Sequence, residues 1–269
     1  MPAQSFCQST PIAYWDGLEK GHLRKFFDHW KACYPTFEIL DDSHVVELLE
    51  EYFIDYVDVY KSIRIPAAKA DIARYILLYA RGGLYIDCNA GVRDIGEVRR
   101  LISKLDQVEL ILFDRLASVG PKRVDEHIFY NGIIMAQKGS GFMFECARQS
   151  LINYAWLKSK ESTQGHVPYD IWGMSGPGLL TAIVTQPGSQ GRQLKRGHER
   201  LILVLKEEDG PIVRGANRTY SSIGSGLHWS ERQRREMLFH EGCLPFGAFV
   251  DARPCPRPKM ARTGQHRPS

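Results

Sequence analysis

Asp87 and Asn89 are the side chains that most clearly indicate chemistry, because they directly follow the short apolar segment Leu84-Tyr85-Ile86. Two oxygen-bearing side chains at alternate positions beyond a strand point to the same side and can reach one ion. Carboxylate and amide oxygens are ligands for Mg²⁺ and Mn²⁺, and such a cation stabilises charge on a phosphate group. The pattern predicts a divalent-cation site beside a phosphorylated ligand.

Asp71 and Arg74 lie upstream of that segment, three positions apart in Ala70-Asp71-Ile72-Ala73-Arg74-Tyr75. The apolar spacing predicts a helix that begins at Pro66 and ends at Gly82-Gly83. Residues three apart share one face of a helix. The two charged side chains therefore either bind a polar ligand together or form a simple ion pair on the surface.

The rest of the chain alternates between predicted strands and predicted helices. Apolar runs predict strands at 11–15, 37–40, 84–86, 108–113, 129–136 and 201–205, and helical spacing predicts helices at 18–34, 43–49, 66–81, 142–157 and 179–184. Polar or glycine-rich segments at 159–166, 173–178 and 186–199 are predicted as loops. This order indicates an α/β fold with a mostly parallel central sheet flanked by helices, in which ligands bind at the carboxyl ends of the strands.

Composition indicates a globular protein with one main domain. The 269 residues are 43% hydrophobic and 25% charged, with a net charge of +4. Residues 251–269 carry five basic residues and one acidic residue, so the rest of the chain is close to neutral and gives no case for nucleic-acid binding. We expect an extension at 1–10, a domain at 11–250 and a basic, disordered Pro/Arg-rich tail at 251–269.

Location is predicted from what the sequence lacks. No run of about 20 apolar residues and no secretory leader pattern is visible, and the six cysteines form no Cys-x-x-Cys pair. These features favour a cytoplasmic protein. The basic tail could also contact an anionic membrane, which would place the protein at the inner membrane face.

The motifs carry a family resemblance. Ala70-Asp71-Ile72-Ala73-Arg74-Tyr75, followed by Gly82-Gly83-Leu84-Tyr85-Ile86-Asp87-Cys88-Asn89, resembles the Asp-x-Asp sugar transferases of glycosyltransferase family 32. These resemble the clostridial glucosylating toxins and the capsular polysaccharide synthesis proteins. The resemblance implies a GT-A fold and a hexosyltransferase that uses a nucleotide-sugar donor, in the first place a UDP-sugar. It also implies a glycan, lipid-linked or polysaccharide acceptor and retention of configuration.

The same resemblance implies roles for particular residues. Asp87 would contact the donor ribose and a Mn²⁺ or Mg²⁺ ion, and Asn89 stands where the main metal carboxylate of the family is found. Asp71 and Arg74 would hold the donor sugar hydroxyls and position the diphosphate.

Four further residues are expected to serve the donor. Trp15 would stack on the nucleotide base, and His228 would add a metal or diphosphate contact. Asn131 and Ser175 match a strand and a glycine-rich loop of the family, and we expect both at the donor site. Each has a structural alternative, since tryptophan is often a core residue and asparagine, serine or histidine often a hydrogen-bonded structural one.

Three alternative functions remain open at this stage. Asn89 is neutral and brings no charge to a cation, so the chain could bind a nucleotide sugar or a glycan without turnover. A transferase with a protein acceptor, as in the toxins, is the second alternative. An interaction subunit that acts through the basic tail is a third.

Overall fold

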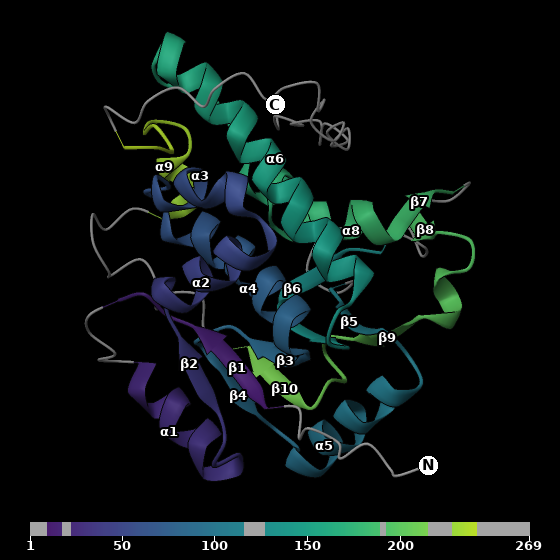
Figure 1. Cartoon of the computed structure of the whole chain (residues 1–269). Helices are drawn as coiled ribbons and strands as arrows, with labels where there is room; N and C mark the ends of the chain where they lie inside the picture. Colours follow the sequence, from purple (N-terminus) through teal and green to yellow (C-terminus); the bar gives the residue numbers. More distant parts are fainter. Residues whose placement is uncertain (1–9, 18–22, 116–126, 189–191, 215–227, 241–269) are drawn as a thin grey trace, which may run out of the picture.

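A six-stranded sheet runs through the centre of the fold, in the order β2-β1-β3-β6-β5-β9 (Figure 1). The computed structural model describes residues 10–17, 23–115, 127–188, 192–214 and 228–240; the predicted tail 251–269 and all but the last residue of the predicted extension lie outside them. The strands of this sheet are β1 (Pro11–Tyr14), β2 (Glu38–Leu40), β3 (Gly83–Ile86), β5 (Leu110–Asp114), β6 (Phe129–Ala136) and β9 (Ile202–Lys206).

The direction of the strands confirms the predicted fold class. β1 pairs in parallel with β2 and β3, and β5 pairs in parallel with β9. β6 alone runs against its neighbours β3 and β5. The sheet is therefore mostly parallel, and the carboxyl ends of β1, β3 and β5 lie at the same edge as the amino end of β6.

Helices cover both faces of the sheet (Figure 1). They are α1 (Arg24–Cys33), α2 (Asp42–Tyr52), α3 (Val57–Lys61), α4 (Pro66–Arg81), α5 (Ile95–Ser103), α6 (Gly141–Gln164), α7 (Ile171–Met174), α8 (Pro177–Val184) and α9 (Trp229–Arg232). Short 3₁₀ turns occupy Ile54–Tyr56, Lys104–Asp106 and His198–Arg200. α2, α4, α6 and α8 pack on one face, and α1 and α5 on the other.

Alternating side chains of the strands fill these two cores. In β5, Leu110 and Leu112 contact the helices of the α4 and α6 face, whereas Ile111 and Phe113 contact the α1 and α5 face. Every residue of β5 and β6 is buried. Strands covered on both faces are expected to be apolar throughout, which is why these segments have continuous apolar sequences.

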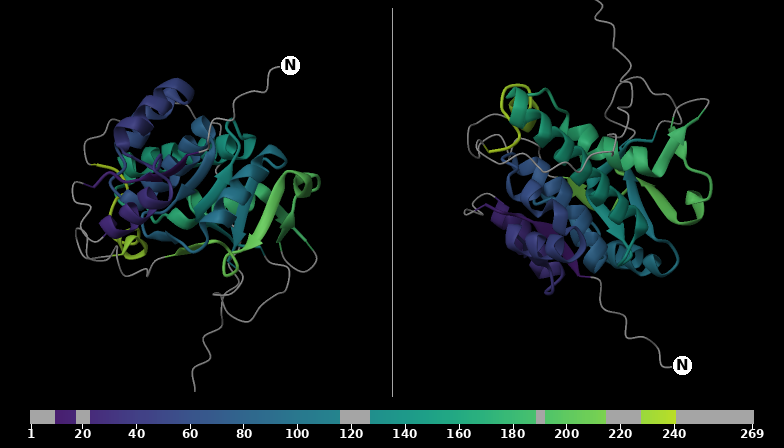
Figure 2. Two further views of the ribbon diagram at one scale, coloured as in Figure 1. Left: turned by 90° about the horizontal axis from the view of Figure 1, so that it is seen from below. Right: turned by 45° about the horizontal axis from the view of Figure 1, so that its top comes forward.

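Two small strand pairs complete the described structure. β4 (Ala90–Val92) pairs antiparallel with β10 (Ile212–Arg214), and β7 (Thr185–Pro187) pairs antiparallel with β8 (Arg192–Leu194). The β7–β8 hairpin lies on the side of the molecule opposite β2 (Figures 1 and 2). It occupies part of the segment predicted as a loop at 186–199.

Helix α6 is longer than the sequence predicts, because the segment expected to be a loop from residue 159 is helical to Gln164. Two polar residues of this part of the helix, Lys158 and Glu161, are buried and paired. Lys158 donates to the carbonyl of Asp58, and Glu161 accepts hydrogen bonds from the backbone of Leu238 and Phe239. The prediction was wrong because these partners are distant in sequence.

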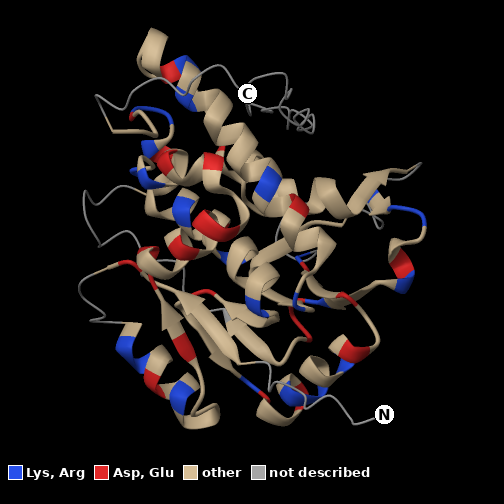
Figure 3. Cartoon of the chain, in the orientation of Figure 1, with Lys and Arg blue, Asp and Glu red and all other residues tan. Residues whose placement is uncertain are grey.

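Charged side chains lie mostly on the helices and connections, with both signs intermixed, and the central strands are largely uncharged (Figure 3). This distribution over the described part agrees with the near-neutral body inferred from composition. None of the described helices combines the length and the apolar character needed to cross a bilayer.

Candidate active site

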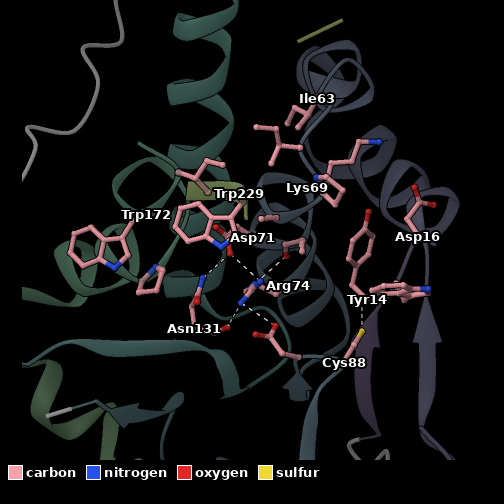
Figure 4. A pocket seen from close by; sticks show the side chains of 18 of the residues that line it. Tyr14, Asp16, Ile63, Lys69, Asp71, Arg74, Cys88, Asn131, Trp172 and Trp229 are labelled. Atoms are coloured by element: carbon pink, nitrogen blue, oxygen red, sulfur yellow. Dashed lines mark hydrogen bonds and ion pairs between the residues drawn. The ribbon is translucent and has the colours of Figure 1, made fainter. Parts of the chain in front are cut away.

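A cavity of about 700 Å³ opens at the carboxyl edge of the sheet (Figure 4). The ends of β1 and β3, the start of β6, helix α4 and the short helices α7 and α9 all contribute to its wall. Its size lies within the range of about 300–1,000 Å³ that is usual for small-molecule sites. The sequence-predicted residues Trp15, Asp71, Arg74, Asp87, Asn89, Asn131 and His228 all line it.

Asp87 is fixed immediately after β3 by a turn. Its backbone N–H donates to Gly132 O at 2.7 Å, and its carbonyl accepts from the backbone N–H of Ala90 at 2.9 Å. Its carboxylate accepts hydrogen bonds from the hydroxyls of Tyr130 at 3.2 Å and Tyr85 at 3.4 Å. With 23% of its side chain exposed, the carboxylate is held in place and still reaches the cavity.

Gly132 provides the space that this carboxylate occupies. A Cβ atom at residue 132 would lie 2.2 Å from Oδ2 of Asp87 and 2.4 Å from the hydroxyl of Tyr130. Both distances are far shorter than van der Waals contact. Glycine at this position of β6 is therefore a steric requirement for the observed placement of Asp87.

Asp71 lies deeper, with only 7% of the residue exposed. Oδ1 accepts a hydrogen bond from Nδ2 of Asn131 at 2.8 Å, and Oδ2 accepts one from Oγ of Ser175 at 3.0 Å. Burial raises the pKa of Asp71 to about 6, against the opposing effects of Arg74 and of these hydrogen bonds. Asp71 therefore exchanges its proton closer to neutral pH than an ordinary aspartate does.

Arg74 lies on the same face of α4 as Asp71 and contacts both Asp71 and Asp87. Nη2 lies 3.0 Å from Oδ1 of Asp71, and Nη1 lies 3.4 Å from Oδ1 of Asp87. Nη1 also donates to the carbonyl of Asn131, and Nε to that of Ala70. Because each guanidinium nitrogen has a protein partner and only 6% of the side chain is exposed, Arg74 is placed to orient the acids.

Asn131 reaches Asp71 because β6 is irregular at this point. The β5–β6 register changes between Leu112 and Phe113, whose partners in β6 are Ile134 and Tyr130. The extra residues of β6 form a bulge, a feature that redirects side chains near functional sites. Asn131 thereby donates to Asp71 through its side chain and accepts from Arg74 through its carbonyl.

Ser175 connects Asp71 to the interior. It follows α7 and is fully buried, and its Oγ lies 2.6 Å from the hydroxyl of Tyr154. Tyr75 donates to the Ser175 carbonyl at 2.8 Å. Ser175 therefore holds Asp71 in position from behind, and does not itself line the cavity.

Trp15 stands at the far end of the cavity, after β1. The residue is half-buried, and a Cβ at Gly17 would lie 2.6 Å from its indole, so the ring packs against that glycine. Its neighbour Tyr14 donates to Asp42, which also forms an ion pair with Lys69. Trp15 thus lines the cavity, and its stacking on a nucleotide base stays a prediction.

His228 is exposed and lines the cavity from the start of α9. Its Nδ1 accepts from the backbone N–H of Ser230 at 3.3 Å and lies 2.7 Å from the hydroxyl of the same residue. Acceptance at Nδ1 leaves the proton of the neutral ring on Nε2. In this tautomer Nε2 donates, which suits a phosphate oxygen better than a metal ion.

The donor set around Asn89 fits a divalent cation only in part. Asn89 is buried in the turn after Asp87, and its Oδ1 has no hydrogen-bond partner within the described residues. The described chain contains no group of three or more His, Cys, Asp or Glu side chains placed to hold a metal. Asp87 and Asn89 therefore fit a Mg²⁺ or Mn²⁺ ion that takes its remaining oxygen ligands from a diphosphate and water.

Sequence reasoning missed several residues of this site. The hydroxyls of Tyr85, Tyr130 and Tyr154 were not singled out, nor were Trp172 and Trp229 as parts of the cavity wall. The one available signal was their aromatic character, which is equally typical of core residues.

Comparison with known proteins agrees with the motif. Residues 21–105 match the sequence model of the glycosyltransferase sugar-binding region containing DXD motif. The matched segment includes Asp71, Arg74, Asp87 and Asn89. The match confirms the prediction of a glycosyltransferase, an enzyme with a DXD-type sugar-binding region. Curated protein sequences contain no match to the chain.

Three solved structures resemble this chain at low sequence identity. PaToxG glycosyltransferase shares 15% identity and a TM-score of 0.45 over 66% of this chain and 68% of its own. The UDP-bound glycosyltransferase domain of the YGT toxin shares 15% identity and a TM-score of 0.40, over 70% of this chain and 55% of its own. The ligand-free form of that domain shares 14% identity and a TM-score of 0.38, over 62% of this chain and 52% of its own. The aligned part thus spans about half of the YGT domain.

Proposed function

We propose that this glycosyltransferase moves a hexose from a nucleotide-sugar donor, in the first place a UDP-sugar, to a hydroxyl of a glycan, lipid-linked or polysaccharide acceptor. The observation that supports this most strongly is the arrangement of Asp87, Arg74 and Asp71 in one cavity wall at the carboxyl edge of the sheet. Two carboxylates around one guanidinium have a net charge of −1, which suits hydroxyl groups that donate hydrogen bonds.

The donor would extend along the cavity from Trp15 to Asp71. Its base would lie at Trp15, its diphosphate near Asp87 and Asn89, and its sugar hydroxyls against Asp71. A divalent cation, when bound, would neutralise charge on the departing diphosphate. His228 would donate from Nε2 to a diphosphate oxygen, in keeping with its tautomer.

The reaction needs no dedicated protein base in this proposal. The bond from the sugar C1 to the diphosphate oxygen breaks, and the acceptor oxygen forms its bond to C1. The acceptor proton passes to the departing diphosphate, so charge and atoms balance. Attack from the face that the leaving group vacates would retain the configuration at C1. Asp87 would act by fixing the charges around the leaving group.

Binding without turnover is the second candidate, and Asn89 favours it. This residue supplies an amide where a second carboxylate would add charge, and its buried Oδ1 lacks a partner in the described structure. A protein of this kind would hold the donor in the same place and release no nucleoside diphosphate.

The proposal is tested by a screen of nucleotide sugars with and without Mn²⁺. A ligand that binds only the folded state raises the melting temperature, and hydrolysis is followed as release of nucleoside diphosphate. A shift with slow hydrolysis by one donor supports the transferase. A shift without hydrolysis, in the presence of varied sugar acceptors, supports the binder, and no shift with any donor contradicts both.

A further inference from the structure

The cavity continues beyond the part that the donor would fill. In Figure 4, Trp172 lies on the opposite side of the Asp71–Arg74–Asn131 group from Tyr14 and Asp16. If the donor of the proposed function extends from Trp15 to Asp71, the nucleotide and diphosphate fill the side of the cavity near Tyr14 and Asp16. The space that Trp172 lines, beside the reacting sugar, is then left for an acceptor.

A glycine is required for the observed position of the Trp172 indole. A Cβ at Gly178, in the first turn of α8, would lie 2.3 Å from Cε3 and Cζ3 of the ring. Gly178 therefore lets the indole pack directly on the helix backbone. The glycine-rich segment 173–178, which the sequence predicts as a loop, supports an aromatic ring here.

The element that carries Trp172 is tied down at several points. The backbone N–H of Ile171 donates to the side chain of Gln233, and Asn153 donates to the carbonyl of Met174. Ile171 is buried in the core beside it. The indole is thus held on a fixed support, which is what a binding platform needs to lose little entropy on binding.

The indole itself is available to a ligand. Trp172 is partly exposed and lines the cavity. Pro177 and Trp229 line the same cavity and add apolar surface. An indole combines a flat apolar face with one polar N–H, which matches a pyranose ring that has a C–H face and hydroxyls at its rim.

We propose that Trp172 forms the acceptor subsite and that its occupant is a pyranose ring of a carbohydrate acceptor. This inference rests on the proposed function for the direction of the donor. It assigns the acceptor to the carbohydrates, and a hydroxyl on a protein side chain becomes the alternative outcome of the test.

The test measures sugar binding directly, without turnover. Tryptophan fluorescence of the full chain, with UDP and Mn²⁺ present, is titrated with methyl glucoside, galactoside and mannoside and with maltose, cellobiose and lactose. Saturable binding is expected, weakened about ten-fold in Trp172→Ala and less in Trp172→Phe, because an aromatic platform contributes on the order of 1 kcal/mol. Gly178→Ala should also weaken binding, since it displaces a ring that is still present.

Trp156→Phe is the matched control. Trp156 lies on α6, packs against the core and does not line the cavity, so sugar binding should be unchanged. Donor hydrolysis without acceptor should be the same in Trp156→Phe and wild type, and its absence from both would count against the proposed function alone. Wild type that binds none of the sugars, binds them equally well as Trp172→Ala, or binds only hydroxyl-bearing peptides would overturn the acceptor subsite.

Discussion

At the scale of single residues, the charges of Asp71, Arg74 and Asp87 determine the electrostatics of the site. Arg74 lies between Asp71 and Asp87, so one buried cation serves two carboxylates. Removing a partner from such a group leaves an uncompensated buried charge, which costs far more than a surface pair. Arg74 accordingly positions the acids, and the remaining negative charge is directed at the ligand.

Gly132→Ala should displace Asp87 without removing it. The new Cβ would lie 2.2 Å from Oδ2 of Asp87, so the carboxylate has to move by an ångström or more. We expect about a 10²-fold loss in the rate of nucleotide-sugar hydrolysis, the size of effect that such a misplacement causes. Hydrolysis kinetics measured beside urea unfolding separate this effect from any loss of stability.

Gly91→Ala is the control for that substitution. Gly91 is also a strand glycine, and its Cβ would meet the nearest atom, Cγ2 of Val213, at an ordinary 3.6 Å. Its hydrolysis rate should match wild type. Full activity in Gly132→Ala would show that the position of the Asp87 carboxylate does not matter.

Asp71 should make stability depend on pH in a defined window. Its pKa is about 6 in the folded chain against an ordinary value of 3.8, so between these values the folded state holds more protons than the unfolded state. Stability then falls as pH rises from about 4 to about 6, and this dependence ends above pH 6. Urea unfolding of wild type and Asp71→Asn in EDTA at several pH values measures it.

The difference in unfolding free energy between the two proteins is the informative quantity. The unfolding free energy of wild type minus that of Asp71→Asn should fall as pH rises through the window and should then level off. A difference that stays constant from pH 4 to pH 7 would mean that Asp71 keeps its ordinary pKa.

At the scale of elements, the ends of strands and short helices position the chemistry. The turn after β3 fixes Asp87, the bulge in β6 directs Asn131, and α7 carries Trp172. Residues 228–240, here named the C-terminal strap, bring His228, Trp229 and Arg232 to the cavity. The strap is attached to α6 by the side chain of Glu161, which accepts from the backbone of Leu238, and to α7 by the backbone N–H of Ile171, which donates to the side chain of Gln233.

Glu161→Gln should loosen the strap. Both oxygens of the buried carboxylate accept from the backbone N–H of Leu238 at 3.0 Å, and Oε2 also accepts from that of Phe239 at 3.2 Å. In glutamine one of these oxygens is replaced by an NH₂ group, which cannot accept, and the charge is lost. We expect a loss of about 1–3 kcal/mol in unfolding free energy. The KM for the donor should also rise, because the strap forms part of the cavity wall. Urea unfolding and hydrolysis kinetics are the measurements.

Glu145→Gln on the same helix is the comparison. Its ion pair with Arg148 is exposed, so its removal should change stability by only a few tenths of a kcal/mol. Equal effects of the two substitutions would show that Glu161 does not anchor the strap.

The sequence was informative wherever the signal is local. Pro66 begins α4 and Gly82 ends it with a φ of 69°, as predicted, so the strand and Asp87 could be placed from the sequence. The strand–helix alternation predicted the fold class for the same reason. Asp71 and Arg74 were expected on one helix face, and the structure pairs them.

The partners of these residues could not be predicted, because nothing local specifies them. Ser175 contacts Asp71 across 104 positions, and Asn131 reaches Asp71 only through a bulge. Polar residues at the end of α6 suggested a loop. Glu161 is instead buried there, because its partners Leu238 and Phe239 are equally remote in the sequence. No element or loop predicted from the sequence includes Trp172, and only the packing against Gly178 reveals its place.

At the scale of the whole molecule, the cavity exists only in the complete fold. The segment 21–105 that matches the family supplies the acids, whereas Asn131, Trp172 and His228 come from later parts of the chain. The wall formed by residues 21–105 therefore carries the residues that match the family. The other walls lie outside the matched segment, and we expect their residues to determine which donor and acceptor this chain binds.

The most direct measurement compares release of nucleoside diphosphate from the best nucleotide sugar by wild type and Asp87→Ala. Asp28→Ala, an exposed acid on α1, is the control. Asp87→Ala should lose about 10²–10³-fold in rate, as expected for removal of a fixed electrostatic group, while the protein still folds because Arg74 keeps Asp71 as its partner. Wild-type turnover by a folded Asp87→Ala protein would contradict the assignment of this cavity as the donor site.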